Sequence, residues 1–489
     1  MGDLGVADGP EPDSSGLDFA RPLLLSCYEL GRQPQQLASA AAALERAGFS
    51  PQLCDVSITK LDEAAVRAAG LVVISVPMHT ALRIGLELLP RVRALAPRAH
   101  ICFQGLYAPL NAALLRTAGA DSAVGEHEGW LVELAEALRA GRALPGLPAA
   151  GARPRIDVVP ARAGLPALEK YGRLLVAGPA GLERRVTGTL EATRGCLHLC
   201  RHCPIPPVWN GRFVAVPVEL VLEDARRQVA AGARHFSFSD PDFLNGPGHA
   251  LAVARGLHAQ HPEVSFDFTA KVEHLLARRD LLPELAALGC VFIVSAVEAL
   301  SPVVLEVLAK GHVRADVEVA LAAVRAAGIS LRPTFVPFTP WTTLDDYLEL
   351  VGWLRDHGLE DEVDPVQLSI RLLLPPGSLL LERAELAAHL RGLDAAGLQH
   401  RWVHPDPRMD ALAETVTAIC EDAAGVAGGE EPVVTFARIH AAAAAVAGVA
   451  APAPAVTGAR RRLPPPRLSE AWFCCAEPTA RQLRSAAGT

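Results

Sequence analysis

Three cysteines in one short segment are the residues whose types and spacing most clearly indicate chemistry. Cys196, Cys200 and Cys203 follow the pattern C-x3-C-x2-C. Cysteine thiolates are the usual ligands of iron–sulfur clusters, and three of them on a four-iron cluster leave one iron without a protein ligand. The pattern therefore predicts a metal centre with one coordination position open to a chelating molecule.

A zinc site is the alternative interpretation of the same segment. With His198 or His202, the three cysteines would complete a tetrahedral set of ligands. Zinc knuckles normally pair their cysteines as C-x2-C twice, and this segment does not have that pattern. The iron–sulfur interpretation is therefore preferred.

The cysteine segment resembles the signature of the radical S-adenosylmethionine (SAM) superfamily, in which the third cysteine commonly follows an aromatic residue. His202 takes that aromatic place here. The resemblance implies a [4Fe–4S] cluster whose open iron chelates the amino and carboxylate groups of SAM. It also implies reductive cleavage of SAM to a 5′-deoxyadenosyl radical, with an electron donor such as flavodoxin or ferredoxin.

Acidic residues follow the strand that is expected over 234–239. Asp240 and Asp242 stand in Asp-Pro-Asp-Phe, which resembles the D-D-x-F motif of radical SAM relatives with an amino-terminal cobalamin-type domain. The resemblance implies that one of these carboxylates receives the amino group of SAM, without deciding which. For Asp242 the alternative is an Asx cap in an Asp-Pro turn.

Three more charged residues lie near the ends of expected strands. Lys271 follows the strand over 264–269 and is a candidate cofactor-binding residue, with a helix cap as its alternative role.

Glu298 closes a buried strand and precedes Lys310-Gly311. This stretch resembles the G-x-E-S and L-x-x-x-x-K-G motifs of the same relatives, whose acid approaches SAM. Arg371 interrupts an apolar run and needs an anionic partner. We expect that partner to be the SAM carboxylate, with an internal salt bridge as the alternative.

These residues must be positioned by an α/β architecture, because strands and helices alternate twice along the chain. The first alternation, over 21–143, predicts a doubly wound, Rossmann-like (flavodoxin-like) domain with ligands at the carboxyl ends of its strands. The second, over 188–400, predicts a partial (β/α)6 barrel with its chemistry at the carboxyl-terminal mouth. Its strands are expected over 188–194, 234–239, 264–269, 290–296, 329–336 and 366–373. The remaining parts are a disordered tail (1–20), a linker (144–187), a helical carboxyl-terminal region (401–468) and a final tail (469–489).

The front domain also resembles a known type of cofactor-binding domain. The segment 119–128, Gly-Ala-Asp-Ser-Ala-Val-Gly-Glu-His-Glu, is close to a motif of the cobalamin-binding domain of radical SAM enzymes, with His127 in place of glycine. The D-x-H-x-x-G motif that supplies a histidine to cobalt is absent. Many relatives bind cobalamin without that histidine, so the resemblance leaves cobalamin open as a further cofactor.

The composition limits the classes of partner. The 489 residues carry a net charge of −8 with a pI near 6.1, so there is no broad basic field for nucleic acid. No export signal opens the chain, and no apolar stretch reaches the roughly 20 residues of a spanning helix. We expect a cytoplasmic protein with no membrane contact, whose ten cysteines are thiols, metal ligands or redox groups.

Adjacent cysteines near the carboxyl end are a second candidate for chemistry. Cys474 and Cys475 stand in Trp-Phe-Cys-Cys-Ala-Glu-Pro. Because neighbouring cysteines form only a strained disulfide, they suit redox work, metal capture or thiol transfer. The segment resembles the tail of the CUAEP/CCAEP-tail radical SAM proteins, in which the second cysteine can be selenocysteine. We expect a catalytic redox or substrate-handling arm, and a disordered end is the alternative.

Together these features predict a radical SAM enzyme that acts on a small-molecule or peptide substrate. A cobalamin-dependent radical SAM methyltransferase is the enzymatic alternative. A non-catalytic iron–sulfur or zinc module is the alternative from another class.

Overall fold

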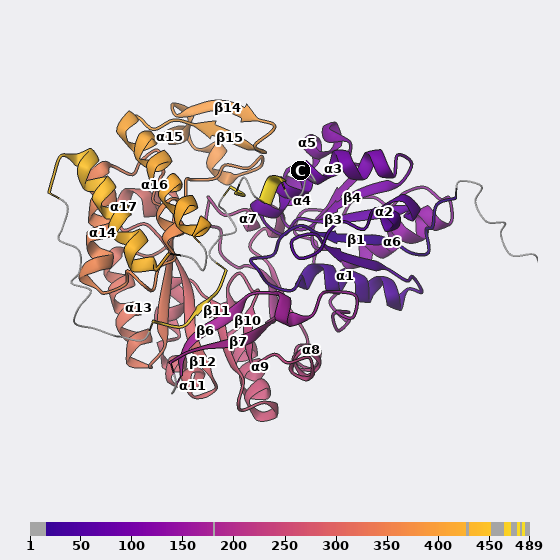
Figure 1. Ribbon diagram of the computed structural model, residues 1–489, viewed down its shortest axis with the longest axis horizontal. Helices are drawn as coiled ribbons and strands as arrows, with labels where there is room; N and C mark the ends of the chain where they lie inside the picture. The colour runs from indigo at the N-terminus through magenta and orange to yellow at the C-terminus, as the bar shows by residue number, and fades with distance from the viewer. Residues whose placement is uncertain are drawn as a thin grey trace, which may run out of the picture.

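The computed structural model describes residues 16–178, 181–426, 430–450, 464–470, 477–479 and 482–484. Figure 1 shows two α/β bodies side by side, the front domain in indigo to violet and the barrel in magenta to orange. Helices of the carboxyl-terminal region pack on the side of the barrel away from the front domain (Figure 1). Among the described residues, no helix has both the length and the apolar character needed to cross a bilayer.

The front domain is a five-stranded parallel sheet in the order β2-β1-β3-β4-β5, with helices on both faces. This 2-1-3-4-5 order is that of flavodoxin-like folds. Its strands are β1 (Leu23–Ser26), β2 (Gln52–Asp55), β3 (Leu71–Ser75), β4 (His100–Gln104) and β5 (Ser122–Val124). Its helices are α1 (Gln35–Arg46), α2 (Glu63–Ala68), α3 (His79–Leu95), α4 (Tyr107–Leu110), α5 (Ala112–Ala118) and α6 (Glu128–Arg139).

The central strands of this sheet are apolar throughout because both faces are covered. Every residue of β1 and β3 is buried, as expected for a parallel sheet between helix layers. The edge strand β2 was not predicted from the sequence. Two of its four residues are only half-buried, so it lacks the continuous apolar run that reveals the inner strands.

The second body is a curved seven-stranded sheet in the order β13-β12-β11-β10-β7-β6-β16. The five strands from β7 to β13 are parallel and form the partial barrel, whose helices α9, α11 and α13 lie on its outer side (Figure 1). The strands are β6 (Arg173–Gly178), β7 (Gly181–Leu190), β10 (His235–Phe238), β11 (Ser265–Thr269), β12 (Cys290–Glu298), β13 (Ser330–Phe335) and β16 (Arg467–Leu468). The helices are α8 (Val218–Ala230), α9 (Pro247–Gln260), α10 (Val272–Ala277), α11 (Leu282–Ala287), α12 (Pro302–Val307), α13 (Arg314–Ala326) and α14 (Leu344–Asp356).

The predicted fold class is confirmed, with local differences in the barrel. The sixth strand expected over 366–373 is instead a 3-10 helix, Pro365–Leu368, followed by an extended segment that makes one bridge, Phe338 to Arg371. An apolar run alone does not distinguish a strand from a buried turn of helix. The segment 144–187, expected as a linker, ends in β6 and most of β7, which are antiparallel to each other.

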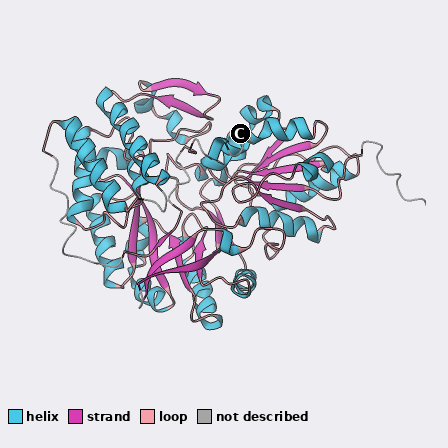
Figure 2. Cartoon of the chain, viewed as in Figure 1, coloured by secondary structure: helices cyan, strands magenta, loops and turns pink. Residues whose placement is uncertain are grey.

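Two smaller units complete the chain. A hairpin, β14 (Leu390–Asp394) and β15 (Gln399–Trp402), precedes the helices α16 (Pro407–Gly425) and α17 (Pro432–Ala447), and α17 packs on α14 and α16. Figure 2 shows these helices as a layer beside the magenta strands of the barrel. At the other end, residues 16–20 of the expected tail contact the front domain, since Asp18 bridges to Ala69.

Glycine is required where β4 turns at the ligand-binding edge of the front sheet. Gly105 has φ +130°, and a Cβ there would lie 2.7 Å from the carbonyl carbon of Val76. We expect Gly105→Ala to lower the free energy of unfolding of the front domain by about 2–4 kcal/mol, because strain and backbone overlap add. Denaturant unfolding of the purified protein measures this.

The matched control is Gly129→Ala, in the first turn of α6, where a Cβ would have no neighbour within 4 Å. Alanine favours the helix there, so stability should stay constant or rise by about 0.5–1 kcal/mol. Equal losses in the two variants would contradict the account of Gly105.

Candidate active site

The three cysteines that are predicted to bind the metal centre lie on one loop at the carboxyl end of the first barrel strand. We call residues 196–204 the cluster loop. It follows β8 (Thr193–Gly195), which pairs with β9 (Phe213–Ala215), and it leads into α7 (Ile205–Trp209). Cys196, Cys200 and Cys203 are all free thiols, and Cys203 lines a large cavity.

The three thiols are close enough to disfavour one another's ionisation. Burial raises the pKa of the Cys196 thiol to about 11, and Cys200 adds to the rise. Burial also raises the pKa of Cys203 far above its ordinary value, and Cys200 and Cys196 both contribute. A bound metal removes this penalty, because a coordinating thiol loses its proton outright. The loop therefore fits a soft metal centre with three thiolate ligands.

Backbone geometry fixes the start of the cluster loop. Gly195 has φ +85°, and a Cβ there would lie 2.5 Å from the Arg212 carbonyl oxygen and 2.6 Å from the Trp209 ring. Asn245 holds the same turn from β10's side of the barrel: its Oδ1 accepts from the Leu197 amide at 3.2 Å, and its Nδ2 donates to the Gly195 carbonyl at 3.3 Å. Only glycine allows the chain to enter the loop on this path.

Asp240 holds the strand that leads into the cluster loop. Its carboxylate accepts hydrogen bonds from the Ala192 amide at 2.9 Å, from Thr193 Oγ1 at 2.7 Å and from the Thr193 amide. Burial raises its pKa to about 7. Both oxygens are engaged with the backbone and side chain of this strand, which fits a positioning role better than the contact with SAM expected from the motif.

Asp242 caps the short 3-10 helix Phe243–Asn245, as the Asx alternative predicts. It accepts from the Leu244 amide at 3.0 Å, from the Lys271 amide at 3.1 Å and from His274 Nδ1 at 2.8 Å. The carboxylate thus joins the ends of β10 and β11 below the cluster loop.

Lys271 lies beside the cluster loop and is buried. Its Nζ pairs with Glu273 and lies 3.3 Å from His198 Nδ1. Burial and the Lys271 ammonium lower the pKa of His198 to about 4, so this imidazole is neutral at physiological pH. A neutral histidine and a cation are therefore in contact beside the cluster loop.

Glu298 is the one predicted carboxylate that is buried, ionised and turned toward the cavity. Burial alone would raise its pKa, but Lys310 and His202 outweigh burial and lower the pKa to about 2. Its Oε1 lies 3.4 Å from Lys310 Nζ and 3.3 Å from His202 Nε2. Glu298 has φ +70°, and such strain in a residue other than glycine is commonly found at functional sites.

Arg371 forms the internal salt bridge that was the alternative to a SAM contact. Its Nη1 donates to Asp410 at 2.6 Å and its Nη2 to the Trp402 carbonyl at 2.9 Å, and the guanidinium stacks 3.8 Å over the Trp402 ring. The residue still lines the large cavity. Its contacts link the cavity wall to α16.

The large cavity lies where the carboxyl ends of the two parallel sheets meet. Its volume is about 400 Å³, within the usual range for small-molecule sites. The front domain contributes Leu30, Met78 and Tyr107, and the cluster loop contributes His202 and Cys203. The rest of the wall includes barrel strand ends and residues 362–375, together with Leu468 and Glu470. Both domains are therefore needed to enclose it.

Two residues of the site were not assigned from the sequence. Asn245 orients the cluster loop, and Arg194, only 2% exposed, forms ion pairs directly before it. A charged residue inside a predicted buried strand, one position before Gly195, is the signal that would have drawn attention to Arg194. Nothing local marks Asn245, because its partners lie about fifty positions away in sequence.

A comparison with protein families matches residues 190–354 to the radical SAM superfamily. This segment is a radical SAM domain. It contains the cluster loop and strands β10 to β13, so the cofactors are a [4Fe–4S] cluster and SAM. The chain is an enzyme, and the non-catalytic iron–sulfur or zinc module proposed as an alternative has no support.

Curated relatives match part of the chain. The ribosomal protein uS12 methylthiotransferase RimO of Paracoccus denitrificans is 27% identical over 215 residues, which is 40% of this chain and 46% of the relative. A RimO of Cereibacter sphaeroides is 29% identical over 206 residues, which is 40% of this chain and 44% of the relative. The chain thus matches less than half of the length of these relatives.

Solved structures extend the likeness to both domains. The radical SAM methyltransferase TsrM of Kitasatospora setae, solved with tryptophan and a SAM analogue, aligns with a TM-score of 0.59 and 20% identity over 82% of this chain and 88% of TsrM. The cobalamin-dependent enzyme OxsB aligns with a TM-score of 0.64 and 14% identity over 87% of this chain and 71% of OxsB. At this identity the likeness establishes the fold: a flavodoxin-like front domain joined to a radical SAM barrel.

The buried pair of Lys310 and Glu298 gives a direct test of the site's electrostatics. We expect Lys310→Met to cost about 3–5 kcal/mol of unfolding free energy, because Glu298 is left as an uncompensated buried charge. Glu298→Gln should have a similar cost, and the double variant should lose clearly less than the sum. Urea unfolding of the metal-free protein at pH 7 measures all three.

Lys170→Met is the control, since Lys170 is exposed and should change stability by no more than about 0.5 kcal/mol. Strictly additive losses in the double variant would show that the two side chains are not coupled.

Proposed function

We propose that the chain cleaves SAM reductively in the large cavity and modifies a small-molecule or peptide substrate held between its two domains. The observation that carries this proposal is the position of the thiols: Cys203 lies on the wall of a cavity of about 400 Å³ that both domains line. The bound cluster supplies the electron that breaks the sulfonium bond of SAM, which no side chain can do. The protein positions the reactants and excludes water.

The side chains around the cavity divide into those that face SAM and those that hold the loop. We assign Glu298 as acceptor for the SAM amino group, because Lys310 keeps it ionised at the mouth of the barrel. Asp240 and Asp242 act as positioning residues, since their carboxylates hold backbone amides near the cluster loop. Lys271 and Arg371 fix the walls on either side.

We propose a broad substrate class because the similar proteins are associated with different substrates. RimO proteins act on ribosomal protein uS12, and TsrM was solved with tryptophan. The cavity of this chain has charged and apolar walls and suits a small molecule or one side chain of a peptide. Flavodoxin or ferredoxin would supply the electron. The net charge of −8 makes nucleic acid a poor partner.

The decisive experiment is anaerobic reconstitution followed by assay of SAM cleavage. We expect the wild-type protein to bind iron and sulfide and to form 5′-deoxyadenosine when reduced. Cys196→Ala, Cys200→Ala and Cys203→Ala should each lose both properties, because a three-thiolate site tolerates no missing ligand. Cys54→Ala, at the edge of the front sheet, is the matched control and should retain both. A protein that holds zinc and forms no 5′-deoxyadenosine would overturn the proposal.

A cobalamin-dependent methyl transfer is the second candidate, and the front domain favours it. The cavity lies at the carboxyl edge of the flavodoxin-like sheet, and TsrM and OxsB, which share this arrangement, were solved with cobalamin. The loop after β1, Cys27–Gly31, contains no histidine, so it offers no nitrogen ligand to cobalt from that position. A corrinoid that copurifies, with S-adenosylhomocysteine as product, would favour this candidate in the same assay.

The cysteine pair of the tail, Cys474 and Cys475, lies outside the described residues. The described residues on either side contact the active-site region: Glu470 lines the large cavity, and Glu477 accepts from His79 Nε2 at 2.9 Å and Arg83 Nε at 3.0 Å. We propose that the pair handles substrate or electrons during turnover.

Cys475→Ser tests this role. We expect the variant to keep its cluster and its uncoupled SAM cleavage but to lose modification of the true substrate, because serine is a far weaker nucleophile and has no redox chemistry. Product analysis by mass spectrometry measures it. Full turnover by the variant would contradict the role.

A further inference from the structure

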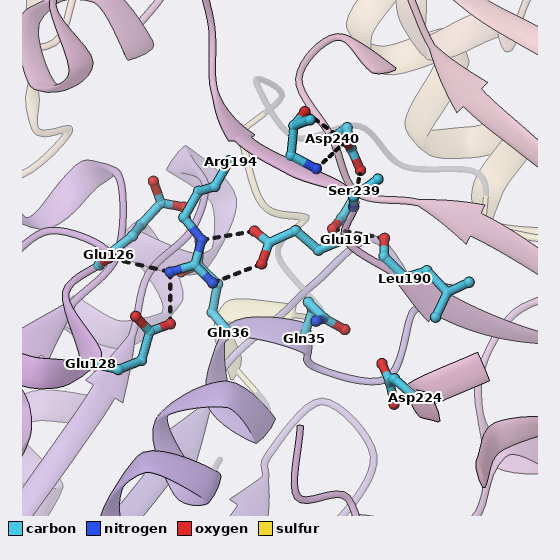
Figure 3. A network of polar contacts seen from close by, with 12 residues as sticks. Gln35, Gln36, Glu126, Glu128, Leu190, Glu191, Arg194, Asp224, Ser239 and Asp240 are labelled. Atoms are coloured by element: carbon cyan, nitrogen blue, oxygen red, sulfur yellow. Dashed lines mark hydrogen bonds and ion pairs between the residues drawn. The ribbon is translucent and has the colours of Figure 1, made fainter. Parts of the chain in front are cut away.

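A second, smaller cavity adjoins the large one and is lined by more carboxyl groups than cations. Its volume is about 140 Å³. It lies between the loop after β1, the loop after β5 and the start of the cluster loop, and it shares Leu30, Arg32 and Met78 with the large cavity. Figure 3 shows part of its wall. Three of its lining residues are glutamates: Glu29, Glu126 and Glu191.

Arg194, one of the two arginines in this wall, donates to two carboxylates and, at 3.2 Å, to the Glu126 backbone carbonyl. Arg194 Nε and Nη2 donate to the two oxygens of Glu191 at 2.8 and 2.7 Å, and Nη1 donates to Glu128 Oε1 at 2.7 Å (Figure 3). Glu128 and Glu191 are 5% and 8% exposed, so these bonds are shielded from water. The ion pairs of Arg194 are with Glu191 and Glu128, and it donates no hydrogen bond to the side chain of Glu29 or Glu126.

Glu126 is held only by neutral donors. One oxygen accepts from Gln36 Nε2 and the other from Trp209 Nε1 at 2.8 Å. Among the described residues, no cation forms an ion pair with its side chain. The carboxyl is thus held by two neutral donors, and the Arg194 guanidinium acts on it without forming an ion pair.

Glu29 has an oxygen with no partner at all. Its Oε1 accepts from the Gln35 amide at 3.0 Å, while Oε2 is buried and makes no hydrogen bond to the described residues. The residue is 8% exposed and lines the cavity. A nine-tenths buried carboxyl with a free acceptor costs free energy unless a ligand supplies the donor. Arg32 lines both cavities but forms no ion pair with Glu29.

Electrostatics agree with this geometry. Burial raises the pKa of Glu29 to about 8 and that of Glu126 to about 7. Without a bound cation, both carboxyls therefore hold a proton more readily than an exposed glutamate does. The charged groups that act on these two carboxyls are Asp55, Arg32 and Arg162 for Glu29, and Arg194, Glu191 and Glu128 for Glu126.

The shape of the acidic group suits an ammonium better than a metal ion. The described residues contain one set of three or more ligands within 4.8 Å of one another, His198, Asp242 and His274, and it lies elsewhere. The described residues of the small cavity offer no such set of three ligands, which disfavours a metal ion there. An ammonium group carries three N–H donors that reach separate acceptors.

We propose that the small cavity binds a primary ammonium group of the substrate, with Glu29 and Glu126 as its counter-charges and the rest of the substrate in the large cavity. The inference rests on the proposed function and narrows its substrate class to amines. The ammonium would be held beside Arg194, one turn of chain from the cluster loop, which sets the distance between the anchored group and the reacting position.

Trp209 provides a reporter, because its indole N–H donates to Glu126. The probe is ethylammonium chloride, compared with ethanol as the neutral analogue, added to the full-length reconstituted protein without reductant. We expect ethylammonium to shift the Trp209 indole resonance in a ¹H–¹⁵N spectrum with saturation on the order of millimolar, as for a ligand of three heavy atoms. Trp209→Phe assigns the resonance. Ethanol should leave it unchanged.

Glu29→Gln and Glu126→Gln should each weaken ethylammonium binding roughly tenfold or more, since each removes a buried counter-charge. Glu223→Gln, on the exposed face of α8, should bind like the wild type. Equal shifts with ethanol, or unchanged affinity in both cavity variants, would overturn the inference. So would a response to cobinamide without one to ethylammonium, which would assign the cavity to neutral corrinoid amides.

Because binding is measured without SAM turnover, the two proposals fail separately. A protein that binds ethylammonium and does not cleave SAM would overturn the proposed function. A protein that cleaves SAM and does not bind ethylammonium would overturn this inference alone.

Discussion

The buried ion pairs of Arg194 are the interaction on which the rest of the site depends. Arg194 is two residues before Cys196, and it joins Glu191 of the barrel to Glu128 of the front domain. Removing these charges from water is expensive, and the cost is recovered only when every donor finds its acceptor in one geometry. A shift of either domain would leave a guanidinium unpaired in the interior. The pairing therefore fixes the cluster loop relative to the front sheet.

Other contacts extend the same constraint. Asp240 holds the strand that contains Arg194, and Asn245 holds the turn at Gly195. On the opposite side, Arg201 of the cluster loop donates to the Glu306 and Val307 carbonyls at the end of α12, at 3.2 and 3.0 Å. The loop is thus tied to both domains before any metal binds. Preorganisation of this kind reduces the ordering that cofactor binding would otherwise require.

Charge is distributed unevenly around the cavities, and two of the few lysines lie next to the cluster loop. The chain contains only four lysines, and two of them, Lys271 and Lys310, are buried beside the cluster loop. A compact ammonium next to thiolates and a carboxylate favours their ionised forms without the planar geometry that a guanidinium demands. The carboxyl-rich small cavity lies on the other side of the loop. The site therefore has two lysine–glutamate pairs near the thiols and a carboxyl-rich cavity toward the front domain.

The sequence alone determined the chemistry of the centre and the class of the fold. The spacing of Cys196, Cys200 and Cys203 is local and needs no tertiary information, and the apolar runs of β1 and β3 are visible because both faces of those strands are buried. The partners of Asp240 and Arg371, and the pairing of Arg194 with Glu128, were decided only by tertiary structure, since these contacts join residues 30 to 70 positions apart. A charged residue in a buried strand indicates that some group must pair with its charge or its hydrogen-bonding atoms. Only the packing of the two domains determines whether that partner is a ligand, a backbone amide or another side chain.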